Sequence, residues 1–300
     1  MKLLTKIRNY LNASANLKYQ NDKILINEGI ILSEIFKDKD INKLADIEFS
    51  VFSQFGDDGI IQYIVNNLQC SNNFFIEFGV GNYFESNTRF LMHKNNWSGF
   101  VMDGSLENIS QLKRSYFYWQ FELKAMNCFI DKNNINKLLN ENAPKEVGIL
   151  HIDLDGNDYW IWREIDLRPD ILILEYNSLF GYDRPITIPY SPKFNRTSAH
   201  QSNLFWGASL KALYELSIDR GYSFLGCNSA GNNAYFVKRN LLNNKIREVS
   251  LEQGFVKSKY RESRNLNGEL SYMSEEEIYE ALKNKKVYNT KLKLEENLFA

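Results

Sequence analysis

The sequence predicts an α/β protein built on one doubly wound sheet of about seven strands, mostly parallel and ending in an antiparallel hairpin. Two patterns lead to this prediction. Short, almost continuously apolar runs recur along the middle of the chain, and stretches with helical spacing separate them. Strands that are apolar on both faces are typical of a parallel sheet covered by helices on both sides. At 300 residues, the chain is long enough for one such domain with extensions.

The chain divides into three segments. Residues 1–50 have helical spacing and many charges, and predict a helical segment that caps the core, pairs with a second subunit or forms a variable N-terminal extension. Residues 51–240 carry the alternating pattern and form the predicted main domain. Within it, residues 178–206 hold three of the five prolines and predict a lid, because long irregular connections in compact domains are commonly lids. Residues 241–300 predict a helical C-terminal extension.

The first predicted strand, residues 74–78, is a run of strand-forming apolar residues that ends at Gly79 and Gly81. Polar side chains at residues 86–88 can then cap a helix that begins at Arg89. Four more strands and a final hairpin follow the same logic. The predicted strands are 100–102, 121–126, 147–152, 171–174, 222–225 and 233–237, and the helices between them are 106–114, 135–139, 159–165 and 208–220.

Acidic residues follow or end four of these strands: Glu77, Asp103, Asp153 and Glu175. In open α/β sheets, ligands bind outside the carboxyl ends of the strands. Four acids on one edge therefore predict a binding site there.

Composition excludes several classes of function. With 36 basic and 37 acidic residues the net charge is −1, which offers no attraction for nucleic acid. The three cysteines are widely spaced and predict neither a disulfide framework nor a zinc site. The N-terminus lacks the apolar core of a signal peptide, and no apolar run is long enough to span a membrane. We expect a cytoplasmic protein.

The ordered set of motifs resembles the class I S-adenosylmethionine-dependent methyltransferases, and within them the bacterial FkbM-type enzymes and their uncharacterised relatives. Residues 75–82 are similar to the first motif of that fold, an acidic residue followed by a glycine-rich turn. The resemblance covers roughly residues 50–240 and implies a Rossmann-like fold. One departure is Tyr83, where the full motif has a third glycine. The other matching phrases are residues 53–59, 152–159, 175–177 and 207–210.

The resemblance implies that S-adenosylmethionine is the methyl donor. Gly79 and Gly81 let the backbone approach its methionine part, and Glu77 orients the turn or binds the donor's amino group. Asp103 accepts hydrogen bonds from the ribose hydroxyls, and Asn127 or its neighbours face adenine. The predicted donor-binding residues are Gln54, Asp58, Glu77, Gly79, Gly81, Asn87, Asp103, Asn127 and Asp153.

Two pairs of oxygen-bearing residues predict a divalent cation site. Asp153 and Asp155 point the same way if their strand continues, and Glu175 and Asn177 have the same spacing on the next strand. Some sugar O-methyltransferases of this fold hold Mg²⁺ at these two strand ends. The alternative is that Asp155 and Asn157 cap the following helix.

For the general base we expect Asp155, directly or through a metal-bound substrate oxygen, with His200 in the lid as a second candidate. His93 and His151 are predicted to be structural. Tyr182 and Tyr190, with the nearby Arg184, are candidates to line the acceptor pocket.

The predicted activity is O-methylation of a small polar acceptor, such as a sugar or surface-polysaccharide precursor. The main alternative is a metal-dependent glycosyltransferase in which Asp153 and Asp155 bind a nucleotide sugar. A third interpretation is a non-catalytic module that keeps the fold.

Overall fold

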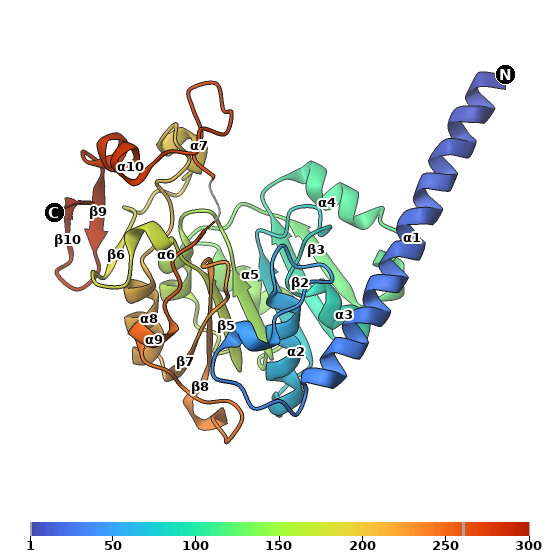
Figure 1. Ribbon diagram of the computed structural model, residues 1–300, viewed down its shortest axis with the longest axis horizontal. Coiled ribbons are helices and arrows are strands. Elements are labelled where there is room, and N and C mark those ends of the chain that lie inside the picture. Colours follow the sequence, from blue (N-terminus) through green and yellow to red (C-terminus); the bar gives the residue numbers. More distant parts are fainter. Residues whose placement is uncertain (1, 260–261, 300) are drawn as a thin grey trace.

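The main domain is a seven-stranded sheet with helices on both faces (Figure 1). The computed structural model describes residues 2–259 and 262–299, with side chains except at positions 2–5, 7–12, 14 and 15. The strand order is β3-β2-β1-β4-β5-β8-β7, and β8 runs in the direction opposite to the other strands of this sheet. The predicted doubly wound, Rossmann-like sheet with a terminal hairpin is therefore confirmed. Its strands are β1 (Phe74–Phe78), β2 (Ser98–Asp103), β3 (Leu123–Asn127), β4 (Ile149–Ile152), β5 (Ile171–Glu175), β7 (Tyr222–Cys227) and β8 (Asn233–Lys238).

Successive residues of each central strand enter opposite cores. In β1, Phe75 packs in one buried cluster, whereas Ile76 and Phe78 pack in the other. This alternation is what a strand with a pleat of two residues requires when both of its faces are covered. Helices α2 (Asp57–Asn67), α3 (Arg89–Asn95) and α4 (Leu106–Lys113) contribute to the first cluster, and α5 (Ile135–Asn142), α6 (Asp158–Glu164) and α8 (Leu210–Asp219) to the second.

A second, three-stranded sheet lies beside the main one, in the order β10-β9-β6 (Figure 1). Strand β6 (Ile186–Thr187) comes from the predicted lid, and β9 (Lys286–Asn289) and β10 (Leu294–Asn297) come from the C-terminal segment. The segment 241–300 is thus not purely helical as predicted, because α9 (Leu251–Gly254) and α10 (Glu275–Leu282) are followed by a hairpin. Because β6 and β9 are about a hundred residues apart in the chain, no local sequence pattern predicts that they pair.

Helix α1 (Lys2–Phe36) leads into the domain and extends well beyond it (Figure 1). Its C-terminal part packs against α2 and α3. Although α1 is 35 residues long, neither it nor any other helix in the described residues has the apolar stretch needed to cross a membrane.

Candidate functional site

Two neighbouring cavities lie at the carboxyl edge of the sheet, where the strand order reverses between β1 and β4. The larger has a volume of about 420 Å³ and the smaller about 200 Å³. Both are lined by Gly79, which follows β1, and by Asp153, which follows β4. They therefore form two arms of one cleft at the topological switch point, which is where open α/β sheets bind ligands.

The glycine turn after β1 separates the two arms. Gly79 has a φ of +73°, and a Cβ atom there would lie 1.8 Å from the carbonyl oxygen of Asp153. Gly81 has a φ of +54°, and a Cβ there would meet no atom within 4 Å, so its backbone faces open space. Tyr83 also has a positive φ, +64°, and its fully buried side chain lies 2.7 Å from the Thr88 hydroxyl. The departure at Tyr83 thus preserves a turn conformation that glycine would adopt more easily.

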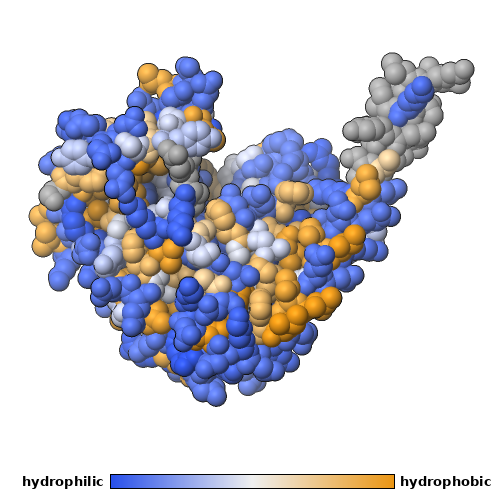
Figure 2. All heavy atoms as spheres, viewed as in Figure 1, coloured by the Kyte–Doolittle hydropathy of each residue, from blue (hydrophilic) through white to orange (hydrophobic). Residues whose placement is uncertain are grey.

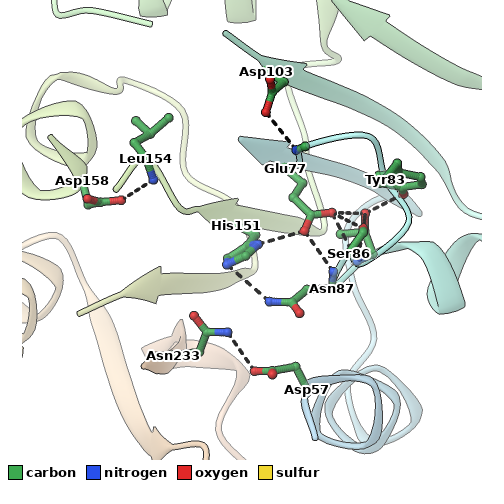
Figure 3. A network of polar contacts seen from close by, with 12 residues as sticks. Asp57, Glu77, Tyr83, Ser86, Asn87, Asp103, His151, Leu154, Asp158 and Asn233 are labelled. Atoms are coloured by element: carbon green, nitrogen blue, oxygen red, sulfur yellow. Dashed lines mark hydrogen bonds and ion pairs between the residues drawn. The ribbon is translucent and has the colours of Figure 1, made fainter. Parts of the chain in front are cut away.

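Glu77 is buried, and its carboxylate binds the residues that follow the glycine turn (Figure 3). Its carboxylate accepts hydrogen bonds from the hydroxyls of Ser86 and Thr88, and from the backbone N–H groups of Asn87 and Thr88. Burial opposes its ionisation, but His151 and these donors prevail and lower the pKa of Glu77. The predicted capping residues 86–88 therefore bind Glu77, and the side chain of Thr88 caps no helix.

His151, predicted to be structural, is also a candidate for ligand binding because it lines the larger cavity. Its Nδ1 lies 3.1 Å from Glu77 and its Nε2 lies 3.4 Å from the amide nitrogen of Asn87. Although burial opposes its charged form, the Glu77 carboxylate raises the pKa of His151. The ring lines the larger cavity, together with Asn87 and Asn233. The signal in the sequence was a single histidine in an otherwise apolar strand.

Asp103 holds the other side of the turn. Its carboxylate accepts hydrogen bonds from the backbone N–H of Gly81 at 2.8 Å and of Ser105 at 2.7 Å. It lines the smaller cavity beside Cys128 and Phe129. Asn127 does not line this cavity, because its amide donates to the backbone carbonyl of Asp103. The neighbours that follow Asn127 face the cleft in its place.

The loop before α2 contributes one predicted residue to the cleft, and the first residue of α2 contributes one that was not predicted. Gln54 lines the larger cavity. Asp58 lines neither cavity, because it is buried and accepts from the backbone N–H groups of Val51, Phe52 and Ser53. Desolvation raises the pKa of Asp58 to about 6. Its neighbour Asp57 lines the cavity instead and accepts from Asn228, Asn233 and Tyr235, which ties α2 to the β7–β8 hairpin.

Three carboxylates come together where β4 and β5 end. Oxygen atoms of Asp153, Asp155 and Glu175 lie within 4.8 Å of one another. Oε2 of Glu175 is buried without a hydrogen-bond partner. Desolvation and the neighbouring acids raise the pKa of Glu175 well above its usual range and that of Asp153 to about 6. The strand does not continue as predicted, because β4 ends at Ile152 and Asp155 has a φ of +52°, so this turn aligns the two aspartates.

Of the two residues considered as alternative caps, Asn157 occupies the N-cap position of α6. The side chain of Asn157 makes no capping bond, and Asp155 lies 2.9 Å from Arg196 of α7 (Arg196–Ala199). Asp158, the first residue of α6, accepts from the backbone N–H groups of Leu154 and Gly156 and so holds the turn that precedes the helix.

Several predicted residues lie elsewhere. The Asn177 amide donates to two backbone carbonyls and accepts from the N–H of Leu179, which commits it to the local fold. His200 lines neither cavity and lies 2.7 Å from the Ser202 hydroxyl. The three candidates for an acceptor pocket do not line the cleft either: Tyr182, Arg184 and Tyr190. From the same segment, Phe194 lines the smaller cavity.

The cleft is acidic. Among the described residues that line the two cavities there is no lysine or arginine, and His151 is the one side chain that can carry a positive charge. Such a surface attracts a cation and repels an anion such as a diphosphate. Six carboxylates line the cleft: Asp57, Glu77, Glu85, Asp103, Asp153 and Asp155.

No protein-family model and no curated protein matches the sequence. Solved structures to which the chain is similar include the plantazolicin methyltransferase BamL with S-adenosylhomocysteine (SAH), at 15% identity and a TM-score of 0.34 over 51% of this chain and 57% of that one. Another is the SAH-bound N-terminal domain of EvdMO1, at 9% identity and 0.40 over 72% and 94%. A third is an S-adenosylmethionine-dependent methyltransferase from Clostridium acetobutylicum, at 15% and 0.30 over 52% and 60%. The chain spans less than two thirds of the first and the third, and likenesses this distant do not assign a function.

Proposed function

We propose that the protein is an S-adenosylmethionine-dependent methyltransferase. The observation that carries the proposal is the charge of the cleft, which is lined by six carboxylates and no lysine or arginine among the residues described. S-adenosylmethionine has a sulfonium and an ammonium group against one carboxylate, so it is a net cation. When bound, it supplies an electrophilic methyl group. A cleft of this charge concentrates a cationic donor and favours it over an anionic one.

The shape of the cleft supports the same ligand. The smaller arm is lined by Asp103 and Phe129, which suit a ribose and an adenine. The larger arm has Asn87 and His151, both held by Glu77, and these two residues suit an amino-acid end. The open backbone at Gly81 lies where the donor would pass between the arms. His151 is the single group there that can pair with the donor's carboxylate.

A divalent cation fits the acid cluster. Asp153, Asp155 and Glu175 are hard oxygen donors, and the unpartnered Oε2 of Glu175 is an unused ligand position. Mg²⁺ held there would lower the pKa of an acceptor hydroxyl. Arg196 is the competing cation, since it already contacts Asp155.

The acceptor in this proposal is a small polar molecule with a hydroxyl group, such as a sugar or polysaccharide precursor. Asp155 is the most exposed member of the acid cluster, and we assign it the role of accepting the hydroxyl proton. We do not assign His200 this role as general base, because its ring contacts the Ser202 hydroxyl and does not line the cleft. The three cysteines are unpaired, in keeping with a reducing cytoplasm.

A metal-dependent glycosyltransferase is the second candidate, because the acid cluster also suits a metal-bound diphosphate. This candidate gives no role to the glycine turn, and the remaining carboxylates of the cleft oppose an anionic donor.

Thermal unfolding with added ligand tests the proposal. SAH should raise the midpoint, with about 2.7 kcal/mol of stabilisation at a hundredfold excess over its Kd. UDP with Mn²⁺ should not. Asp103→Ala should weaken the SAH effect, whereas Asp131→Ala should not, since Asp131 also binds backbone N–H groups but lies outside the cleft. A midpoint raised by UDP and Mn²⁺ alone would favour the glycosyltransferase.

A further inference from the structure

Helix α1 has one face packed against the domain. Asp22 is buried and lies 2.6 Å from Arg89, and the Ser33 hydroxyl lies 3.5 Å from Gln62. At Gly29, a Cβ would lie 2.4 Å from Val51, so the helix approaches closely there. Since 22, 29 and 33 follow helical spacing, they define the inner face of α1.

The opposite face of α1 is apolar and exposed. Leu17, Ile24, Ile31 and Ile35 are 55–63% exposed. At 100° per residue, these four positions lie within a narrow stripe that points away from the inner face. Figure 2 shows hydrophobic atoms gathered along this part of α1. Isolated exposed apolar residues are ordinary, but an aligned row of four on one helix marks an interaction surface.

The spacing of the row indicates what covers it. Leu17, Ile24 and Ile31 are seven residues apart, and in the sequence positions 3 and 10, a leucine and a tyrosine, continue the same repeat toward the N-terminus. A repeat of seven drifts by only about 20° per repeat on an α-helix, so this row forms one seam that can face a second helix along its length. A helix of 35 residues is about 52 Å long, enough for such a seam.

The charges along the seam select the direction of pairing. Lys6 and Glu28 are exposed and lie on the same side of α1 as the apolar row, near its two ends. In a parallel, in-register pair, each Lys6 would face another Lys6 and each Glu28 another Glu28. In an antiparallel pair centred on Leu17, every Lys6 faces a Glu28, so the charges are complementary. The same register places the small Ala13 opposite Asn21, which leaves room for the longer amide side chain.

We propose that two copies of this chain associate through α1 as an antiparallel helix pair with its twofold axis at Leu17. In this register Leu17 meets its own counterpart, Ile24 lies opposite position 10, and Ile31 lies opposite position 3. The interface is isologous, as closed dimers require. Each globular domain lies on the side of its helix away from the seam, so the two domains do not compete for the surface. The pairing also supports the part of α1 that extends beyond the domain, since helices gain most of their stability from packing.

Analytical ultracentrifugation of the full-length chain tests the proposal. At micromolar concentration the protein should sediment with twice the chain mass of 35.1 kDa. Ile24→Glu should lower the association constant at least a hundredfold and yield monomers that stay folded, with helical circular dichroism lost only from the part of α1 beyond the domain. Leu266→Glu is the matched control, because Leu266 is 81% exposed and lies outside α1, so this variant should remain dimeric. A monomeric wild type at all concentrations would overturn the proposal.

A charge exchange tests the direction and register. Lys6→Glu and Glu28→Lys should each weaken the dimer, and the two together in one chain should restore it, because every Lys6 faces a Glu28. Failure of the double variant to recover would overturn the antiparallel register. Binding to phosphatidylglycerol vesicles tests whether a lipid surface covers the apolar row instead. If the wild-type protein is monomeric in solution and binds the vesicles, and Ile24→Glu abolishes that binding, the row contacts lipid and the dimer proposal is wrong.

Discussion

Glu77 and Glu175 both lie near the carboxyl ends of their strands, β1 and β5, and both are buried, yet their surroundings are opposite. Glu77 accepts hydrogen bonds from two hydroxyls and two backbone N–H groups and pairs with His151. Glu175 faces Asp153 and Asp155 and keeps one oxygen without a partner. As a result the pKa of Glu77 is lowered and that of Glu175 is raised well above its usual range.

The difference separates two uses of a buried acid. A carboxylate whose oxygens are fully bonded holds the surrounding chain in place and has little capacity left for a ligand. A carboxylate that faces other carboxylates is unstable when ionised, until a cation or a proton arrives. The β1 end is therefore the support of the cleft, and the ends of β4 and β5 are its reactive part.

Removing the support should have the largest effect. Glu77→Gln leaves His151 without its anion and four donors with a weaker acceptor, so the free energy of unfolding should fall by about 3 to 5 kcal/mol. Urea denaturation at neutral pH measures it. Glu85→Gln, on the wall of the same cavity but exposed, should change it by less than about 0.5 kcal/mol. If both variants lowered the free energy of unfolding equally, Glu77 would support the fold no more than an exposed residue of the cavity wall does.

The glycine turn joins the two regions and gives the next effect. Gly79→Ala adds a Cβ that collides with the Asp153 carbonyl, and should cost about 3 kcal/mol of unfolding free energy. Gly81→Ala has the same backbone strain but open space, and should cost about 1 kcal/mol. Under the proposed function, Gly81→Ala should also weaken the midpoint shift with SAH. A loss of unfolding free energy mainly in Gly79→Ala and a loss of SAH binding mainly in Gly81→Ala would separate the structural part of the turn from its ligand-binding part.

The ion pair between His151 and Glu77 should make the free energy of unfolding depend on pH. The pKa of His151 is raised in the folded protein by Glu77, so its contribution is complete below its usual 6.5. The contribution is lost as pH rises through the raised value, and the free energy of unfolding falls by at most about 1.4 kcal/mol per pH unit. Denaturation at a series of pH values above 6.5 measures the slope. His151→Gln should flatten this pH dependence. If the variant kept the wild-type slope, the slope would have to come from another titrating group.

The smallest effect is expected in the reactive region. Glu175→Gln removes repulsion from Asp153, so the free energy of unfolding should rise by about 1 kcal/mol or stay unchanged. If Mg²⁺ binds the cluster, it should stabilise the wild type and lose this effect in the variant. Glu146→Gln, an exposed acid outside the cleft, should behave like the wild type. Marked destabilisation by Glu175→Gln would mean that both strand-end glutamates are structural.

The sequence by itself determined the sheet and the edge where the site lies. Continuous apolar runs can be buried only between two helical layers, and each run ends where a glycine or an acid interrupts it. The turn at Gly79 and Gly81, and the acids Asp103 and Asp153, could be found in this way, because strand, turn and acid are neighbours in the chain.

Only the tertiary structure decided what each acid does. The partners of Glu77 lie 9 to 74 residues away, and Asp57 reaches a hairpin more than 170 residues further on. Arg196 meets Asp155 across 41 residues of chain, from the segment that follows β6. Local sequence patterns encode burial and turns, whereas the donors around a carboxylate are set by packing between distant segments, and it is those donors that fix its charge and its role.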